Sequence, residues 1–258
     1  MLLKGRVAVV SGIGPGMGRD ITLALARAGA DVVLGARTES ALNAVAEEVE
    51  PLGRRVVCVP TDITDPDQCR RLADAAAGLG RVDVLVNNAF TEEDWSHFEG
   101  FDVERWRSPF AVNVFGSLQL SQAVVPHMKA VGGGSIVMIT TLSIRMVNPV
   151  LGGYAASKRS LTSAAQAMAR ELGPHGIRVN CVAPGHIWGR SLEHYFEYLA
   201  ERRGTTAQDV YDEIAATTAL NHIATSEEIA RVVVFFASDL SRVITGQTLD
   251  VNCGRTLD

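Results

Sequence analysis

Val7-Ala8-Val9-Val10-Ser11-Gly12-Ile13-Gly14-Pro15-Gly16-Met17-Gly18 is the stretch that decides the fold. Apolar residues lead into a glycine-rich turn, and an amphipathic segment over 19–28 follows at once, which predicts a buried strand, a tight turn and a helix. Glycines let the backbone turn sharply and approach a ligand closely, while the helix start offers free N–H groups and a positive dipole end to a phosphate. Because a dinucleotide-binding fold needs such a turn at its first strand–helix junction, we favour a phosphate site over an ordinary turn.

Length and composition bound what the chain can be. Its 258 residues, 47% of them hydrophobic, suit one large α/β domain or two small ones. The formal net charge of -5, with no basic stripe, argues against nucleic acid as a partner. We find no signal peptide and no apolar run long enough to span a bilayer, so we expect a cytoplasmic protein without a membrane partner.

Cysteine and histidine spacing argues against a metal site. Cys58, Cys69, Cys181 and Cys253 form no Cys-x-x-Cys pair, so we expect reduced, mostly buried thiols rather than disulfides or metal ligands. The histidines show no paired spacing such as His-Glu-x-x-His. We therefore predict no metal.

Strand and helix signals alternate along the chain. The apolar period predicts further strands over 31–34, 55–60, 82–86, 134–140, 178–183 and 247–251. It predicts helices over 38–50, 65–80, 103–129, 153–172 and 225–238, with Pro109 as a candidate break. Strands buried on both faces with helical crossovers form a parallel sheet. We therefore expect a single-domain α/β fold of the Rossmann type over 1–258: a doubly wound parallel sheet with helices on both faces.

Capping signals mark three of the helix starts. Asp65-Pro66-Asp67-Gln68 combines an acceptor, a proline in the first turn and a glutamine placed to reach back. Thr225-Ser226-Glu227-Glu228 is a capping box, and Thr38 is expected to cap the helix that follows it.

Tyr154-Ala155-Ala156-Ser157-Lys158 is the second informative stretch. On a helix, Tyr154 and Lys158 lie one turn apart on the same face. A phenol titrates near pH ~10, and a nearby ammonium favours the phenolate and lowers that pKa. Such a pair can transfer a proton to or from an alcohol or ketone, although the spacing by itself also fits a surface contact.

The order of the motifs resembles that of the classical short-chain dehydrogenase/reductase family over essentially the whole chain. The matching motifs are Ser11-Gly12 with Gly16 and Gly18, Asn87-Asn88-Ala89, Asn113, Thr141 and Ser143, Tyr154-x-x-x-Lys158, Pro184-Gly185 and Ile244-Thr245-Gly246-Gln247. The resemblance implies an NAD(P)-dependent oxidoreductase that interconverts a secondary alcohol and a ketone by hydride transfer. It also implies a small-molecule substrate and a homo-oligomer, commonly a tetramer.

The resemblance assigns roles position by position. Tyr154 would be the general acid/base, Lys158 would bind the nicotinamide ribose and depress the Tyr154 pKa, and Asn113 would anchor a water chain that relays the proton. The reacting oxygen needs a second hydroxyl donor, for which we prefer Thr141. Ser143 is the alternative, because it lies on the same side if the backbone stays extended, and local bending must choose between them. Further cofactor contacts are expected from Gly12, Gly14, Gly16, Met17, Gly18, Asp62, Ile63, Asn87, Asn88, Ala89, Pro184, Gly185 and Ile187.

Four positions depart from the family pattern. Phe90 stands where the family usually has glycine, Thr141 where it has its catalytic serine, and Gly189 where a threonine often contacts the carboxamide. Asn252-Cys253-Gly254 replaces the common Asp-Gly-Gly. None of these changes removes the Tyr154–Lys158 pair.

The residues after the second strand bear on the choice of cofactor. An acidic residue there would bind the adenosine ribose hydroxyls and select NAD, but Ala36 occupies that place. Arg37 follows and can pair with a 2′-phosphate, although Pro15 stands where NADP-preferring members often carry a basic residue. We expect NADP, with NAD as the less favoured alternative.

The segment over 186–222 is rich in aromatic residues and follows the carboxyl end of a strand. We expect a mobile helical substrate lid there, over a mainly apolar pocket suited to a bulky or cyclic carbonyl compound. His186, Trp188 and Tyr195, together with Ser143, are the expected substrate contacts, although the lid aromatics also fit an ordinary helix face. Trp95 and Phe98 are expected to close the opposite side.

Other functions fit parts of the sequence. A reductase of activated carbon–carbon double bonds would space its tyrosine and lysine more widely, and a non-catalytic NADP-sensing regulator would lack the pair. A methyltransferase would use the glycine turn and leave the pair unexplained. Since a fold does not fix a function, the site must decide among them.

Overall fold

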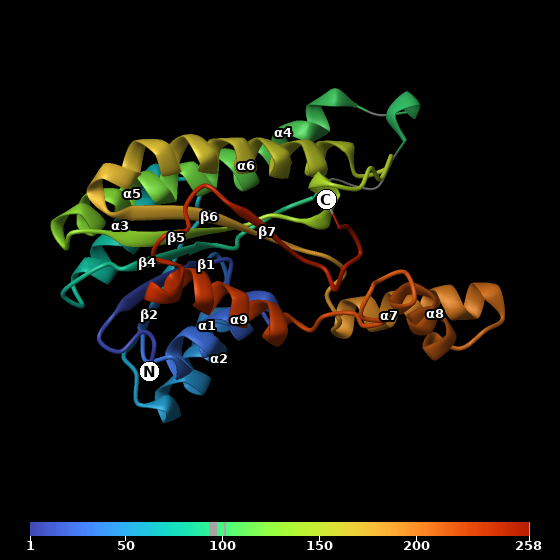
Figure 1. Ribbon diagram of the computed structural model, residues 1–258, viewed down its shortest axis with the longest axis horizontal. Helices are drawn as coiled ribbons and strands as arrows, with labels where there is room; N and C mark the ends of the chain where they lie inside the picture. The colour runs from blue at the N-terminus through green and yellow to red at the C-terminus, as the bar shows by residue number, and fades with distance from the viewer. Residues whose placement is uncertain (93–96, 101, 258) are drawn as a thin grey trace.

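The sheet places the carboxyl ends of its central strands at one edge, where the glycine turn begins. The computed structural model describes residues 1–92, 97–100 and 102–257, which leaves Trp95 outside the described residues. Seven parallel strands pair in the order β3-β2-β1-β4-β5-β6-β7 (Figure 1). The direction of winding reverses between β1 and β4, which creates a crevice at their carboxyl ends. This is the Rossmann-type, doubly wound sheet that the sequence predicts.

The strands are short, apolar and covered on both faces. Alternate side chains of β1 enter opposite layers: Ala8 and Val10 pack in one apolar core, Val7 and Val9 in the other. The bounds are β1 Val7–Ser11, β2 Asp31–Ala36, β3 Val56–Pro60, β4 Val84–Asn87, β5 Gly134–Ile139, β6 Ile177–Pro184 and β7 Thr248–Val251.

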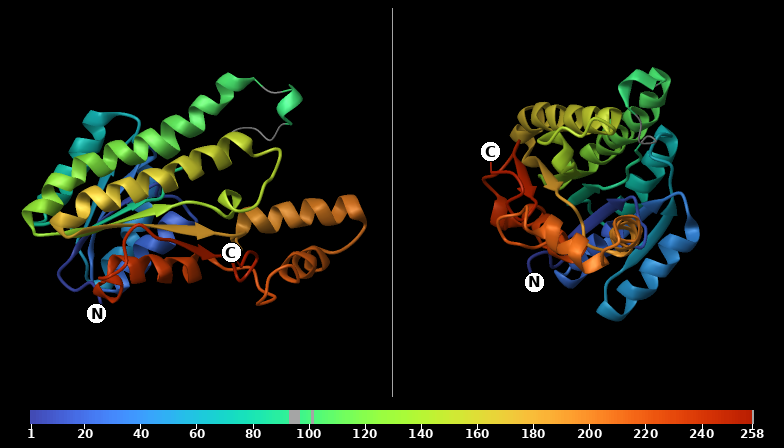
Figure 2. Two further views of the ribbon diagram at one scale, coloured as in Figure 1. Left: turned by 45° about the horizontal axis from the view of Figure 1, so that its top comes forward. Right: turned by 90° about the vertical axis from the view of Figure 1, so that its right-hand side faces the viewer.

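Helices fill the layers on the two sides of the sheet (Figure 2). One layer holds α1 Met17–Arg27, α2 Glu39–Val49 and α9 Ser226–Ala237, whose apolar faces contribute Ile21, Leu42 and Phe236 to the first core. The other holds α3 Pro66–Ala77, α5 Ser117–Ala130 and α6 Gly152–Leu172, which contribute Leu72, Leu120 and Leu161 to the second. Short helical turns join them at η1 Glu50–Leu52, η2 Phe98–Gly100, η6 Gly173–His175 and η7 Asp239–Ser241. In the described ranges, no helix is both long and apolar enough to cross a membrane.

The capping predictions have different outcomes. The Asp65 side chain accepts from the backbone N–H groups of Asp67 and Gln68, and Thr225 heads a complete capping box, both as predicted. Thr38 is the N-cap residue of α2, as predicted, but its side chain makes no capping hydrogen bond. Its backbone carbonyl accepts the first helical hydrogen bonds, from the N–H groups of Ala41 at 3.1 Å and Leu42 at 3.3 Å.

The stretch predicted as one helix over 103–129 is helical but irregular. It consists of η3 Val103–Trp106, α4 Arg107–Pro109, the π-helix η4 Phe110–Gly116 and α5. Pro109 does not interrupt it; the wider π turn follows directly. Such turns are rare and are often found at functional sites. Here the π turn carries Asn113.

The segment over 186–222 forms two helices, α7 Arg190–Arg203 and α8 Ala207–Ala215, which project beyond the end of the sheet (Figure 1). They share a small apolar core of Phe196, Ala200, Val210, Ala215 and Ile223. The helical nature of the expected lid is therefore confirmed. These core residues face one another rather than the sheet.

Candidate active site

The glycine turn divides into residues that pack on the protein and residues that face open space. Gly12 has φ +77°, and a Cβ there would overlap the main chain of Ala89; a Cβ on Gly18 would overlap the Gly12 carbonyl. Beside Gly14 and Gly16, by contrast, there is nothing within 4 Å of an added Cβ. Gly16 is the N-cap of α1 and supplies no side-chain cap. The turn thus leaves room for a ligand where the helix dipole favours an anion.

The turn is held against the segment that follows β4. Asn88 Nδ2 donates to the Gly12 carbonyl at 2.8 Å, and the Asn88 N–H donates to Ser11 Oγ at 3.3 Å. Asn87, expected to line the cofactor, instead points into the core, where its Nδ2 donates to Ser121 Oγ at 3.0 Å. The first asparagine of the motif therefore packs in the core, and the second holds the turn.

A cavity of about 430 Å³ runs along the carboxyl ends of β1, β2 and β4. It brings together Gly12, Arg37, Asp62, Ile63 and Ala89 from the predicted cofactor residues. Its other lining residues are Ile13, Gly35, Ala36, Thr38, Thr61, Thr64, Phe90, Thr91, Ser108 and Val112. Most of the additional residues are neighbours of predicted ones. Ser108 and Val112 come from the irregular helix and carry no signal in the sequence.

Asp62 lines this cavity, and hydrogen bonds fix its carboxylate. Its carboxylate accepts from the Thr64 N–H at 2.9 Å and from Thr64 Oγ1 at 2.7 Å. These hydrogen bonds lower the pKa of Asp62, and the positive charge of Arg37 adds to the effect. The group is therefore a carboxylate at neutral pH and can accept a hydrogen bond from a ligand amine.

Other predicted cofactor residues lie elsewhere. Met17 and Ile187 pack against the core on the α1 side. Pro184 ends β6 and pairs with Val251, and a Cβ on Gly185 would meet Asn252. Pro184 and Gly185 therefore lie at the carboxyl end of β6, beside β7. None of these four residues lines the cavity described above.

Tyr154 and Lys158 occupy the first half of α6, on one face as the spacing predicts. The Lys158 side chain is 2% exposed, and its Nζ donates to the Ile139 carbonyl at 2.7 Å. Its Nζ lies 6.0 Å from the centroid of the Tyr154 ring. Burial lowers the pKa of Lys158 to about 7, since removing an ammonium from water disfavours its charged form.

Asn113 ties three segments together. Its Oδ1 accepts from the Thr91 N–H at 2.9 Å, and its Nδ2 donates to the Thr91 carbonyl at 2.8 Å and to Ser157 Oγ at 2.9 Å. Ser157 Oγ in turn donates to the Tyr154 carbonyl at 2.8 Å. The π turn, the segment after β4 and α6 are thereby connected. We did not single out Ser157 from the sequence; its place inside the Tyr154–Lys158 motif was the available signal.

Thr141 and Ser143 lie at the turn after β5, where η5 Leu142–Ile144 begins. Thr141 Oγ1 accepts from the Ser143 N–H at 3.3 Å, and the two hydroxyl oxygens are 3.4 Å apart. Leu142 and Ile144 are buried. The backbone does not stay extended after Thr141, and the 3₁₀ turn rather than strand alternation brings the two hydroxyls together.

The predicted substrate residues of the lid have distinct surroundings. The Trp188 ring packs 4.8 Å from Tyr211 and 5.6 Å from Phe196, between centroids, so it belongs to the lid's own core. Tyr195 is 41% exposed, and His186 lines a small cavity with His222 and Arg255. Phe98 is exposed in η2. Within the described ranges, no cluster of histidine, cysteine or acidic residues has the arrangement of a metal site.

Comparison with known proteins finds relatives along nearly the whole chain. A family model described as enoyl-(acyl carrier protein) reductase matches residues 12–256. The 7alpha-hydroxysteroid dehydrogenase of Escherichia coli K12 is 32% identical over 255 residues, which cover 98% of this chain and 94% of that protein. Carveol dehydrogenase from Mycobacterium avium, solved in complex with NAD, has a TM-score of 0.91 at 29% identity and 98% coverage of both chains. L-Sorbose reductase from Gluconobacter frateurii, solved with NADPH and L-sorbose, has a TM-score of 0.92 at 28% identity and 100% coverage of both.

Proposed function

Because the chain belongs to the short-chain dehydrogenase/reductase family and is an oxidoreductase acting on CH–OH groups, we propose that it interconverts a secondary alcohol and a ketone with Tyr154 as the general acid/base. The observation that carries this proposal is the Tyr154–Lys158 pair: a buried amine beside a phenol, on one face of α6. In this arrangement the protonated amine would stabilise the phenolate, so that Tyr154 can exchange a proton with the reacting oxygen.

The residues around the cavity fit a nicotinamide dinucleotide. The space beside Gly14 and Gly16, at the uncapped start of α1, suits the pyrophosphate, and the Asp62 carboxylate suits the adenine amine. Lys158 would hold the nicotinamide ribose hydroxyls. Met17, Ile63, Asn88, Ala89, Pro184, Gly185 and Ile187 would complete the contacts, with Gly12 and Gly18 shaping the turn. The bound cofactor gives or takes the hydride, while the protein supplies orientation and a path for the proton.

The proton path proposed here begins at Tyr154. Asn113 anchors its outer end, and the Asn113–Ser157–Tyr154 connection holds that path beside α6. We propose Thr141 as the second hydroxyl donor to the reacting oxygen, with Ser143 as the alternative. The 3₁₀ turn supports either, because it places both hydroxyls together at the end of β5.

Arg37 supports NADP as the preferred cofactor. It lies at the end of β2, exposed and lining the cavity, with Ala36 where an NAD-selecting carboxylate would stand. The matched structures include one solved with NAD and one with NADPH, so the preference rests on this chain's own residues.

The surface and the lid complete the proposal. A groove of about 550 Å³ between α5 and α6, with Phe115 56% exposed, suits contact with a second copy of the chain. We propose a homotetramer, as the family resemblance implies, which light scattering would test. The α7–α8 unit would act as a substrate lid, with His186, Trp188 and Tyr195 near a bulky or cyclic carbonyl compound. The free cysteines agree with a cytoplasmic location.

Tyr154→Phe tests the proposed function. A screen of ketones and secondary alcohols with both cofactors identifies a substrate by absorbance of the reduced nicotinamide. On that substrate, Tyr154→Phe should lower kcat by about 10²–10⁴-fold while cofactor binding persists, since the ring remains and the proton donor is lost. Near wild-type turnover would overturn the assignment.

A second candidate function has one observation in its favour. The matched family model carries the name of an enoyl reductase. Including activated enoyl compounds in the same screen distinguishes the two: reduction of the double bond with no activity on any ketone or alcohol would favour that alternative.

A further inference from the structure

Phe90 occupies the position where glycine is usual in this family, and its ring lies in the cofactor cavity. The side chain is 58% exposed and lines the cavity together with Ala89 and Thr91. An exposed aromatic side chain next to a reactive pair calls for an explanation, because nothing in the core requires it.

The backbone on both sides of Phe90 is anchored. Ala89 packs so closely on Gly12 that no Cβ fits between them. Thr91 is held through both its N–H and its carbonyl by the Asn113 side chain, at 2.9 and 2.8 Å. The main chain of Phe90 is therefore fixed, and the direction in which its ring enters the cavity is set by the fold.

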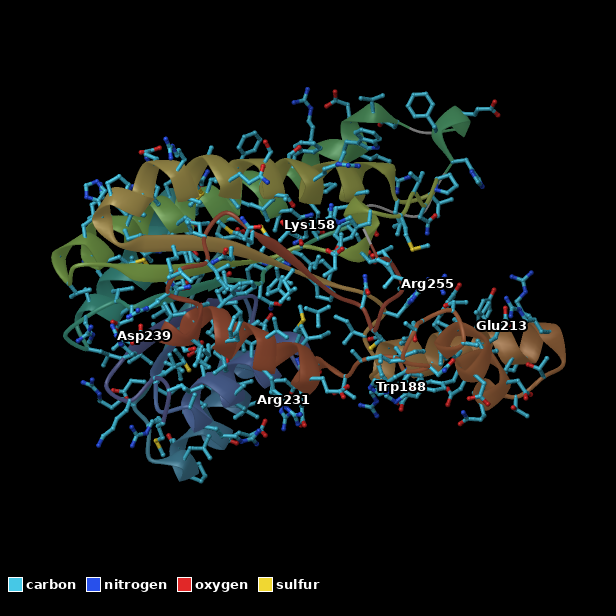
Figure 3. All side chains as sticks on the ribbon, in the orientation of Figure 1. Lys158, Trp188, Glu213, Arg231, Asp239 and Arg255 are labelled. Atoms are coloured by element: carbon cyan, nitrogen blue, oxygen red, sulfur yellow. The ribbon has the colours of Figure 1, made fainter. Side chains whose placement is uncertain are left out.

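The ring meets both members of the reactive pair. Its centroid lies 5.9 Å from Lys158 Nζ and 6.3 Å from the Tyr154 ring centroid, and the Tyr154 ring is 6.0 Å from the same nitrogen. Lys158 lies between α6 and the sheet (Figure 3). Nζ donates to the Ile139 carbonyl, and the two ring centroids lie about 6 Å from it.

An ammonium in such a place needs compensation. Its burial disfavours the charged form, whereas the negative face of an aromatic ring within about 6 Å attracts a cation. The titratable group that acts on the charge of Nζ is Cys181 on β6, whereas Tyr154, on the same helix, meets Nζ through its ring. Burial raises the pKa of Cys181 to about 11, so that thiol stays neutral and supplies no charge at working pH.

We propose that Phe90 is a positioning residue for Lys158: its ring, with that of Tyr154, favours the protonated form of the lysine nitrogen beside the Ile139 carbonyl, where it can bind the cofactor ribose. The inference rests on the proposed role of Lys158 in cofactor binding. It predicts that the aromatic ring, and not merely apolar bulk, is what the position needs.

Direct titration of the lysine tests the inference without a substrate. The chain contains three lysines, Lys4, Lys129 and Lys158, so selective carbon-13 labelling of lysine gives few signals to assign. Phe90→Leu keeps an apolar cover and removes the ring, and Phe90→Tyr keeps the ring. Phe98→Leu, at an aromatic residue that is 74% exposed in η2, is the matched control.

The expected result is a shift at one signal. In Phe90→Leu the protonated amine loses the ring's attraction, so the Lys158 midpoint should fall by about half a pH unit. In Phe90→Tyr and Phe98→Leu the Lys158 midpoint should stay unchanged. The signals of Lys4 and Lys129 should be the same in every variant. An unchanged or raised Lys158 midpoint in Phe90→Leu, or an equal fall in Phe90→Tyr, would overturn the inference.

Cofactor affinity measured by calorimetry against pH separates this inference from the proposed function. Where the protonated amine binds the ribose, Phe90→Leu should bind about threefold more weakly at pH 8 and nearly normally at pH 5.5, because half a unit of midpoint corresponds to that factor. A shifted Lys158 midpoint with a pH-independent affinity would uphold the Phe90 inference and overturn the proposed role of Lys158.

Discussion

The cofactor cavity and the lid are built in opposite ways. The cavity is bounded by main chain that also belongs to the central core, and hydrogen bonds join segments far apart in sequence, such as Asn88 to Gly12 and Asn113 to Thr91. The lid buries Phe196 in a small core of its own and projects beyond the sheet (Figure 2). Its attachments include a hydrogen bond from the Trp188 N–H to the Ala224 carbonyl at 2.8 Å and one from the Leu220 N–H to the Cys253 carbonyl at 3.1 Å.

In the proposed function, this difference would separate cofactor binding from substrate selection. A change that moves the main chain of the cavity wall should disturb the fold, because the same backbone belongs to the core. A change in the lid can remain local, since units with their own contacts open at lower free energy than the core.

Gly12→Ala should have the largest effect. The residue has φ +77°, and the new Cβ would overlap the Ala89 main chain, so we expect a loss of about 4 kcal/mol in the free energy of unfolding, from backbone strain and overpacking together. Gly14→Ala is the control, because open space surrounds it: its melting should match the wild type while cofactor affinity falls. Denaturant unfolding measures the stability of both variants. A Gly12→Ala protein as stable as the wild type would show that the cavity wall is not part of the core.

Thr141→Val should have the second-largest effect. It should lower kcat by about 10²–10³-fold, because one preorganised hydroxyl donor is lost while the shape of the side chain is kept. Thr141→Ser should stay active, and Ser143→Ala should be mild. Steady-state kinetics on the substrate identified for the wild type provide the measurement. Should Ser143→Ala prove the damaging change and Thr141→Val be tolerated, the donor is Ser143.

Phe196→Ala should destabilise the lid by about 3 kcal/mol, since it empties the centre of a small core. Because that core is separate, the effect should appear as faster proteolysis within 190–215, with the melting of the body nearly unchanged. Cofactor and substrate together should protect this region in the wild type. Equal destabilisation of lid and body would mean that the lid is not a separate unit.

Arg37→Ala should have the smallest effect, about a tenfold loss in kcat/KM with NADP and little change with NAD, since one charge-assisted contact to the 2′-phosphate is removed. The fold should be untouched because the side chain is exposed. A wild-type enzyme that prefers NAD would contradict the cofactor preference itself.

Much of the architecture was predictable because its signals are local. The apolar runs of the strands, the caps at Asp65 and Thr225, and the helical spacing of Tyr154 and Lys158 each depend on a few neighbouring residues. Details that the sequence left open depend on contacts beyond the local segment. Thr38 is the N-cap residue, but its side chain makes no capping hydrogen bond, and the chain after Thr141 turns with Leu142 and Ile144 buried.

The sequence by itself determined the sheet, the glycine turn and the reactive pair, since periodicity, glycine conformation and helix spacing act within one element. Only the tertiary structure decided that Asn87 faces the core while Asn88 holds the turn, that Trp188 packs with Tyr211, and that the Phe90 ring lies over Lys158. Each of these outcomes depends on which side chain from a distant segment fills the space opposite. Close packing of this kind is decided only when the helices and strands come together.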